Sequence, residues 1–395
     1  MLILHSPAHR AHAPAHEIYR GERVPCFESP ARAEFVLRAL RAHGHDIREP
    51  THDSRSLLPR VHAPRYLDFL ESAWAQWLAL DAANDRRQPF PSVWPVRSLR
   101  SDVEPDNFIA RLGLYSMDNG SPLAAGTWAA AKAGADAAVS AASHLARGVP
   151  AVFCATRPPG HHAGADFMGG YCFINNAALA AEALLQHGAA RVAILDVDYH
   201  HGNGTQSLFY ERADVLFASL HGDPRTEYPF YLGHADETGA GPGQGCNLNL
   251  PLPAGSDVAA WFDALHSACE RIAQHRPDAL VVSLGLDTFV DPRHGGGACN
   301  RRALEANQPR TELITVGGRE LLRYLPLPID LAIVRGSLAD PAGNLSLVHE
   351  AADLDVVPRA GEGCGRTEAP RGILYHRYRT DADGTIVDAR IVDRK

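Results

Sequence analysis

Short apolar runs alternate with alanine-rich stretches of helical character through residues 126–290. The stretch 126–148 has Thr127 as a cap candidate and closes on Gly148, and 175–188 likewise begins with Asn and ends with Gly, as helices often do. A further helix is predicted near 257–275, and strands are predicted at "PAVFCAT" (150–156), 191–198, 214–223 and 278–287. Strands and helices that alternate in this way predict an α/β fold with a parallel sheet covered on both faces.

Polar side chains follow several of these strands. His161 and His162 come after the first strand in "RPPGHHA", Asp196 and Asp198 end the second, and Asp287 ends the last. Ligands of open parallel sheets bind outside the carboxyl ends of the strands. We therefore expect these side chains to share one edge of the sheet and to form the functional site.

The pattern changes after about residue 292. "PRHGGGACNRRALEANQPR" has the composition of a Gly-rich and Arg-rich connector, and "TELITVGG" is consistent with one more strand. "APRGILYHRYRTDADGTIVDARIV" predicts a β-hairpin that turns at Asp383-Gly384. The last hundred or so residues are therefore predicted to form an atypical C-terminal appendage.

Composition and charge narrow the possible functions. The chain has 395 residues, of which 45% are hydrophobic, no apolar run reaches the roughly 20 residues of a membrane span, and its first residues lack a signal peptide. A cytoplasmic protein without a membrane partner is expected. The net charge of −8 disfavours nucleic acid and suits a small cationic partner. The seven scattered cysteines form no C-x-x-C pair, so any metal is expected on His and carboxylate groups.

The segment "DVDYHHGNGTQ" concentrates metal-binding side chains at a strand end. Asp196, Asp198 and His200 project to one side of an extended chain, and we expect Asp198 and His200 to bind a metal while Asp196 supports the site. Asp287 is the candidate third ligand. Such a ligand set leaves one coordination position of zinc open for water and substrate. His161 and His162 are the candidates for proton transfer, and the sequence does not show which of them is the acid and which the base. The histidine pair, the Asp-x-Asp-x-His segment and Asp287 would each, taken alone, also suit a capping or structural role. Their joint occurrence favours a catalytic metal site.

Several segments of the chain resemble a known family. "RPPGHHA", "GGYCFINNAALAA", "VAILDVDYHHGNGTQSLFY", "FASLHGDPRTEYPF" and "LVVSLGLDTF" are similar to the acetylpolyamine amidohydrolase branch of the histone deacetylase superfamily, and the resemblance runs nearly continuously over residues 1–290. It implies a three-layer α/β/α fold with a mainly parallel central sheet, of the arginase and deacetylase type. It also implies zinc on Asp198, His200 and Asp287, with His161 and His162 as the general acid and base pair.

Further expectations come from the same resemblance. Asp196 would orient the metal site and, with Ser219 and the carbonyl groups around His200, hold a potassium ion. Tyr171 and Tyr228 match the aromatic walls of the family's narrow acyl-amine tunnel, where flat apolar walls suit a methylene chain and acidic surroundings suit an ammonium group. The alternative is that both tyrosines are half-buried core residues. The family likeness also suggests a homodimer.

The resemblance breaks in the C-terminal part. Family members end their last core strand with Gly-Gly-Tyr, whose hydroxyl stabilises the oxyanion, whereas "TVGGRELLRY" places Arg319 there and has Tyr324 five residues later. Loss of one oxyanion donor typically lowers turnover by about 100-fold to 1000-fold. Residues 293–355 resemble a coenzyme A transferase fragment and 356–395 a nickel-iron hydrogenase large subunit, so the predicted domains are 1–292 and these two pieces.

The sequence leaves alternative functions open. The first is a zinc-dependent deacetylase of acetylated polyamines or related N-acetyl amines, in which Arg319 or Tyr324 replaces the missing donor. A protein deacetylase that acts on acetyl-lysine is its nearest rival. The third is a deacetylase-like protein that binds metal and ligand with little or no catalysis.

Overall fold

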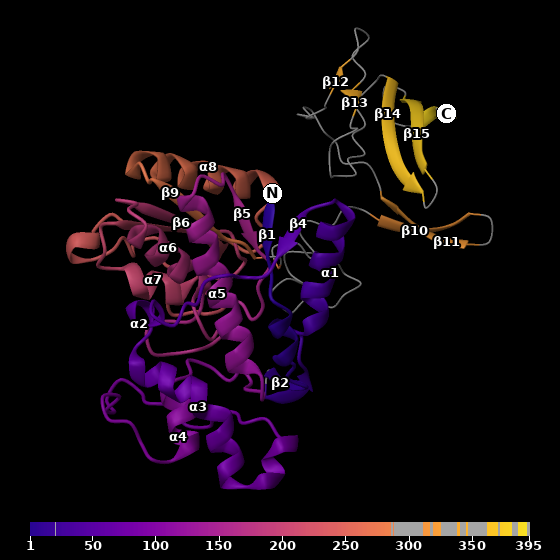
Figure 1. The fold of residues 1–395 in the computed structure, drawn as a ribbon. Helices are drawn as coiled ribbons and strands as arrows, with labels where there is room; N and C mark the ends of the chain where they lie inside the picture. The colour runs from indigo at the N-terminus through magenta and orange to yellow at the C-terminus, as the bar shows by residue number, and fades with distance from the viewer. Residues whose placement is uncertain are drawn as a thin grey trace. The chain divides into compact units, whose positions relative to one another are not determined.

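The computed structural model describes residues 1–19, 21–285 and 287, and beyond them the backbone of seven strands between Thr311 and Val392 (Figure 1). The chain divides into two compact units, Met1–Ala306 and Asn307–Lys395. The predicted domain boundaries after residues 292 and 355 lie outside the described residues.

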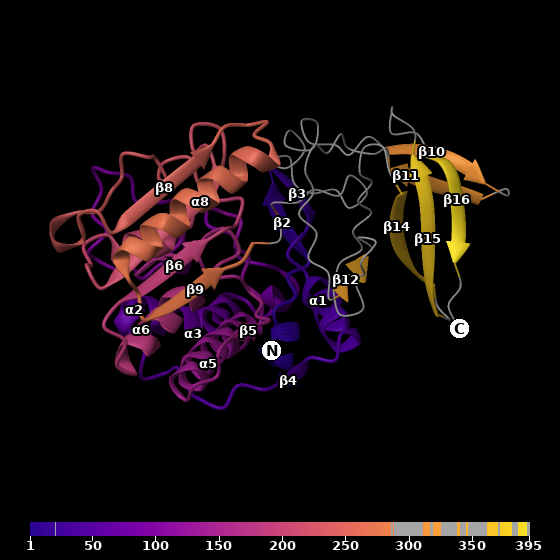
Figure 2. The ribbon, with the colours of Figure 1, turned by 90° about the horizontal axis from the view of Figure 1, so that it is seen from above.

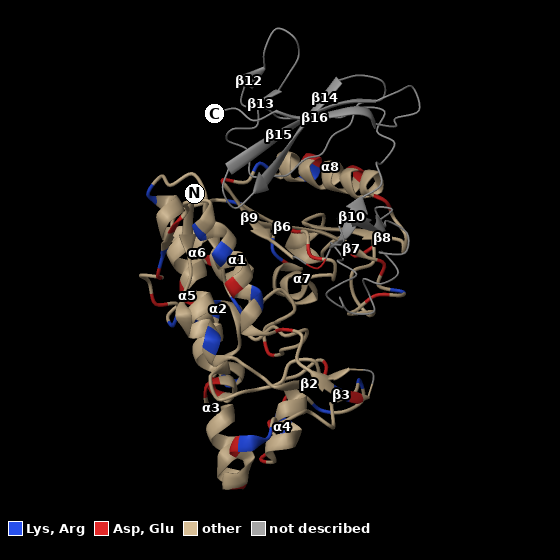
Figure 3. Cartoon of the chain, turned by 90° about the vertical axis from the view of Figure 1, so that its right-hand side faces the viewer, with Lys and Arg blue, Asp and Glu red and all other residues tan. Residues whose placement is uncertain are grey.

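The larger sheet of the first unit is parallel and has the strand order β8-β7-β6-β9. Its strands are β6 (Val192–Asp196), β7 (Val215–Gly222), β8 (Asn247–Leu252) and β9 (Ala279–Ser283). Both faces of β6 and β7 are buried, and most of their side chains are apolar. Figure 3 shows Lys, Arg, Asp and Glu mainly on the helices and loops around the sheet. Asp196 pairs with Ser219 and Ser283, so the carboxyl ends of three strands meet at one edge.

A smaller parallel sheet has the order β4-β1-β5, with β1 (Leu2–Leu4), β4 (Asp46–Arg48) and β5 (Val152–Cys154). Helices α5 (Thr127–Ala146) and α6 (Asn176–Gln186) pack against each other, α5 on β1 and β5 and α6 on β6 and β9. On the opposite faces, α1 (Pro30–Ala42) covers the smaller sheet and α8 (Val258–His275) covers β6, β7 and β8 (Figure 2). The predicted three-layer α/β fold is confirmed, with its parallel strands divided between two sheets.

The remaining elements of the first unit connect these layers. They are the hairpin β2 (His16–Tyr19) and β3 (Glu22–Pro25), the helices α2 (Leu58–Val61), α3 (Pro64–Leu80), α4 (Phe108–Leu114) and α7 (Asn203–Phe209), and the 3-10 helices η1 (Pro7–Ala11), η2 (Ala82–Arg86) and η3 (Gly241–Gly243). Helices within the described part of the chain are too short or too polar to cross a membrane.

Local signals place the helix ends. Helix α6 begins after Asn175, whose Oδ1 accepts the N–H of Ala178 at 3.0 Å, as predicted from the sequence. The predicted cap of α5 is wrong by one position. Gly126 is the N-cap, and the hydroxyl of Thr127 accepts the N–H of Ala124 at 2.8 Å instead. Thr127 therefore stabilises the loop before the helix rather than the first helical turn.

The second unit consists of antiparallel strands, described by their backbone. Strand β10 (Thr311–Val316), which was predicted, pairs with β11 (Arg319–Tyr324). Strands β12 (Leu338–Ala339) and β13 (Leu345–Ser346) form a short pair, and β14 (Glu362–Ala369), β15 (Gly372–Thr380) and β16 (Ile386–Val392) form a three-stranded sheet. The predicted hairpin corresponds to β15 and β16, and its turn at Asp383-Gly384 lies outside the described residues.

The prediction that both faces of the parallel sheet are covered is wrong at β9. Val281 packs against the core on the side of α6, but Leu280, Val282 and Leu284 are 46%, 50% and 53% exposed. The reason is that α8 packs on β6, β7 and β8, and among the described residues α6 is the helix that packs on β9, from the side of Val281. The apolar run of this strand is therefore half solvent-facing.

Candidate active site

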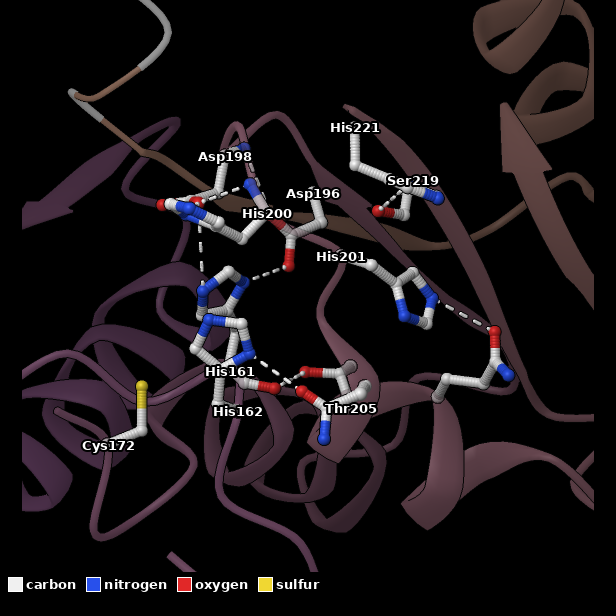
Figure 4. Close-up of polar contacts among 12 residues, drawn as sticks. His161, His162, Cys172, Asp196, Asp198, His200, His201, Thr205, Ser219 and His221 are labelled. Carbon is white, nitrogen blue, oxygen red and sulfur yellow. Dashed lines mark hydrogen bonds and ion pairs between the residues drawn. The ribbon is translucent and has the colours of Figure 1, made fainter. Parts of the chain in front are cut away.

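The predicted metal ligands converge at the carboxyl edge of the larger sheet (Figure 4). Asp198 and His200 lie in the loop after β6, and Asp287 follows β9. Nδ1 of His200 lies 2.8 Å from Oδ2 of Asp287 and 3.3 Å from Oδ1 of Asp198. One ligand atom from each residue lies within 4.8 Å of the others. Two carboxylate oxygens and one imidazole nitrogen can thus face a single cation.

Backbone hydrogen bonds determine where these ligands lie. The N–H of Asp198 donates to Oδ1 of Asp196 at 3.1 Å, which turns the chain as it leaves β6. The N–H of Tyr199 donates to Oδ1 of Asp287 at 3.1 Å and ties the two loops together. Gly285 allows this approach, because a Cβ atom there would lie 2.2 Å from Oδ2 of Asp198.

A pair of buried imidazoles lies beside the ligand cluster. The ring centroids of His161 and His162 are 4.0 Å apart. Nδ1 of His161 is 2.9 Å from Oδ2 of Asp196, and Nδ1 of His162 is 2.7 Å from Oδ1 of Asn203. An amide oxygen accepts only, so Nδ1 of His162 carries the proton and its Nε2 keeps a lone pair when the ring is neutral. Nε2 of His161 lies 3.8 Å from Oδ1 of Asp198.

The surroundings of the two imidazoles shift their pKa values in opposite directions. Burial lowers the pKa of His161, but the charges of Asp196 and Asp198 outweigh it and raise that pKa to about 9. A dication bound between Asp198 and Asp287 would oppose these carboxylates and lower the value. Burial, His161 and His200 together hold the pKa of His162 well below its ordinary range. The pair thus combines a ring that favours the proton with one that is neutral at pH 7, as acid and base chemistry requires.

The two predicted tyrosines both donate to carboxylates, and Tyr228 contacts the imidazole pair. The ring of Tyr228 stands edge-on to His162 with centroids 5.0 Å apart, and its hydroxyl donates to Oδ2 of Asp118 at 2.7 Å. The hydroxyl of Tyr171 donates to Oε1 of Glu17 at 3.0 Å. Both hydroxyls are therefore engaged, and a carboxylate lies beside each tyrosine.

A glycine lines the wall beside the imidazoles. Gly170 has φ +52°, and a Cβ atom there would lie 2.2 Å from Cδ2 of His162. Its N–H donates to Asp118 at 3.0 Å. The backbone itself thus forms the surface on which the His162 ring rests, and a side chain at this position would displace the ring.

Some functional candidates were missed by sequence reasoning. Asn203 lies inside the motif that holds the metal ligands, so its proximity to them was a usable signal. Asp118 and Glu17 gave no signal, because each precedes its tyrosine partner by more than a hundred residues. Only the folded chain brings these carboxylates to the site.

The remaining predicted residues occupy definite places. Asp196 and Ser219 are fully buried partners on β6 and β7, and Oγ of Ser219 is 2.8 Å from Nδ1 of His221. Arg319 and Tyr324 lie at opposite ends of β11, opposite Val316 and Thr311. Their side chains lie outside the described part of the structure, so a role as replacement oxyanion donor stays a prediction for each.

The chain is similar to several known proteins. The histone deacetylase domain family matches residues 26–310. Acetylpolyamine amidohydrolase 2 of Pseudomonas aeruginosa is 54% identical over 292 residues, which are 74% of this chain and 84% of that protein. Acetylpolyamine amidohydrolase of Mycoplana ramosa is 44% identical over 290 residues, with 73% and 84% covered. The crystal structure of an acetylpolyamine aminohydrolase from Burkholderia pseudomallei, soaked in iodide, matches with a TM-score of 0.70 at 38% identity, covering 75% of this chain and 85% of that one.

Proposed function

The chain belongs to the histone deacetylase domain family and is an amide hydrolase, and from this premise we propose that it uses zinc to remove acetyl groups from acetylated polyamines or related N-acetyl amines. The observation that carries the proposal is the cluster of ligand atoms from Asp198, His200 and Asp287 beside two buried imidazoles of different acidity. Metal, base and acid are needed together for amide hydrolysis near neutral pH.

The donor set suits zinc. Two carboxylates and one imidazole are a three-ligand set of the catalytic kind, in which a further position stays open. His161 and His200 hold the pKa of Asp198 below its ordinary range against the effect of burial, so that carboxylate is ionised and ready to bind. Bound zinc would lower the pKa of a water molecule and polarise the substrate carbonyl. We also propose a potassium ion near Asp196 and Ser219, which the pairing of β6 and β7 places together.

The protein groups divide the proton transfers. His162, neutral and with Nε2 free, accepts the proton of the attacking water, while Asn203 holds its ring in place. Asp196 keeps His161 oriented and favours its protonated form. The imidazole pair then returns a proton to the leaving amine. Arg319 stands where relatives are expected to carry the oxyanion tyrosine, so we expect a kcat about 100-fold to 1000-fold below that of the Pseudomonas relative.

A small cationic amine suits the entrance to this site. The rings of Tyr171 and Tyr228 offer flat surfaces for a methylene chain, and Glu17 and Asp118 add negative charge beside them. The net charge of −8 has the same sign. These features favour a polyamine over a neutral acyl amide.

We propose that a second copy of the chain covers an apolar surface at the end of α3. The side chains at the end of α3 and in the segment after it that are 53% to 62% exposed are Leu80, Val93, Val96, Leu99 and Val103. Clusters of exposed apolar side chains mark association sites more often than free surface. Light scattering should give twice the mass of one chain, and Val96→Asp with Leu99→Asp should halve it. A wild-type monomer at micromolar concentration would contradict the homodimer.

We also propose a cytoplasmic location, because the free cysteines in the described residues suit a reducing compartment.

An acetate-release assay tests the proposed activity. The zinc-loaded chain is incubated with an N-acetylated polyamine and, in parallel, with an acetyl-lysine peptide, and we expect turnover of the polyamine to be faster. His162→Ala should abolish it, whereas His266→Ala, which removes an exposed imidazole on α8, should not. Absence of acetate release from both substrates would overturn the enzyme proposal and favour a protein that binds without catalysis.

A further inference from the structure

The side-chain amide of Asn203 lies between the proposed base and a thioether. Its Oδ1 lies 2.7 Å from Nδ1 of His162, and its Nδ2 donates to Sδ of Met117 at 3.2 Å. Asn203 is 7% exposed and His162 is 3% exposed, so these contacts are largely shielded from water. Within the described part of the chain, the Met117 sulfur is the acceptor that this amide N–H group meets. The imidazole and the thioether thus share the two ends of one amide.

An amide in this position can bind an imidazole in two ways, because a half turn about χ2 exchanges its oxygen and its nitrogen. With Oδ1 of Asn203 toward His162, Nδ1 of the neutral ring carries the proton and Nε2 keeps a lone pair. With Nδ2 toward His162, the amide donates to Nδ1, and the ring proton moves to Nε2, which then cannot accept a proton from water. Each arrangement makes one hydrogen bond to the ring, so a modest preference at the other end of the amide decides between them.

The sulfur of Met117 supplies such a preference. A thioether is a weak acceptor and has no proton to donate. It attracts the amide N–H group of Asn203, and in the turned amide it would face Oδ1, which is a second acceptor. We propose that Met117 is a positioning residue, which orients the Asn203 amide and so keeps the Nε2 lone pair of His162 available for proton transfer.

The backbone beside Met117 determines where its side chain lies. The N–H of Met117 donates to the carbonyl of Met168 at 2.8 Å. A Cβ atom on Gly169 would lie 2.2 Å from Cγ of Met117 and 2.8 Å from its sulfur, so the thioether rests on this glycine. The next residue, Gly170, supports the ring of His162 in the same manner. One short segment therefore supports both groups that contact the amide.

The role of Met117 rests on the proposed function of His162 as the base, and it names what selects the tautomer of that base. The tautomer is a property of the ring before any substrate is bound. It can be measured without turnover, so a failure of this role and a failure of the proposed reaction are distinguishable.

Nitrogen-15 NMR of the full chain, labelled at histidine, tests the proposal directly. The spectrum is recorded without metal at neutral pH, where the low pKa of His162 leaves its ring uncharged, and His162→Ala identifies its signals. We expect the wild type to carry the ring proton on Nδ1. Met117→Leu removes the sulfur at similar volume and should show both tautomers. Met168→Leu makes the same change at a fully buried methionine and should retain the wild-type signals.

Steady-state kinetics of the zinc-loaded chain provide the second test. Met117→Leu should lower kcat at least about twofold and leave KM unchanged, because fewer rings then have a free Nε2 while the substrate contacts stay the same. A carboxylate accepts hydrogen bonds through both oxygens, so Asn203→Asp has no second orientation that removes the acceptor from His162. Met117→Leu should therefore leave the kcat of Asn203→Asp unchanged when the proteins are compared on the plateaus of their pH profiles.

Three results would overturn the proposal. One is a single tautomer of His162 with the proton on Nδ1 in Met117→Leu, because the sulfur would then be dispensable. Another is an equal loss of kcat in Met117→Leu and Met168→Leu, which would indicate a general effect of packing. The third is a loss from Met117→Leu that persists in Asn203→Asp. A wild type without turnover would contradict the proposed reaction, and the NMR spectra would still decide on the role of Met117.

Discussion

Replacement of Asn203 by Asp should move the acid limb of the pH dependence of kcat/KM to higher pH. Oδ1 of Asn203 lies 2.7 Å from Nδ1 of His162, so the variant puts a carboxylate in hydrogen-bond contact with the proposed base. A negative charge at this distance raises the pKa of an imidazole by about 1 to 3 units. The base works in its neutral form, so activity is lost as pH falls through its pKa. Because burial and neighbouring imidazoles hold that pKa low in the wild type, the acid limb should move to higher pH in Asn203→Asp.

The profile of kcat/KM from pH 5 to 10 measures this shift, with a zinc content determined at each end of the range. Asn107→Asp is the matched control, because it makes the same change at an exposed N-cap where Asp is equally effective. A shift near 2 units corresponds to about 2.7 kcal/mol between the two protonation states. An unchanged acid limb in Asn203→Asp, with metal retained, would refute the assignment of His162 as the base.

Further predictions concern Gly170 beside the imidazoles, the metal ligands and the hydrophobic core. Gly170→Ala should lower kcat at least about tenfold through displacement of the neighbouring imidazole, whereas Gly21→Ala, also at positive φ (+82°) but with open space around it, should leave kcat unchanged. Asp287→Asn should lower the zinc content measured by mass spectrometry, and chelation of the wild type should abolish turnover that added zinc restores. Leu179→Ala should lower the free energy of unfolding in urea by about 2 to 5 kcal/mol, and Val258→Ala, at an exposed position of α8, by less than about 1 kcal/mol. Equal losses within either matched pair, or full zinc in Asp287→Asn, would contradict these assignments.

The order of strands and helices was predictable where local signals agreed. Strand β6 is apolar and β-branched and ends in carboxylates, and α6 begins at an Asn and is followed by a Gly, so pattern and capping chemistry indicated the same elements. The approach of Asp287 to His200 followed from one rule, that the carboxyl ends of parallel strands meet. The family resemblance over residues 1–290 is confirmed by the match of the histone deacetylase domain to residues 26–310.

Other features depend on packing that no local pattern records. The hydrogen bond from Tyr228 to Asp118 joins two loops, and loop positions are set by the whole fold. The exposure of Val282 was not predictable either, because an apolar strand looks the same in sequence whether or not a helix covers it. The cap of α5 shifted by one residue because the Thr127 hydroxyl found a partner in the preceding loop.

The position of Asp287 connects metal binding with the stability of the larger sheet. Asp198 and His200 lie in the loop after β6, which has a neighbour on each side, whereas Asp287 follows β9, which among the described residues pairs only with β6. A dication bound by all three residues would link β9 to the loop after β6, and its binding free energy would add to the stability of that strand pairing. The melting temperature of the protein should therefore rise with zinc concentration. On chelation, β9 should be the first strand of the sheet to lose its pairing.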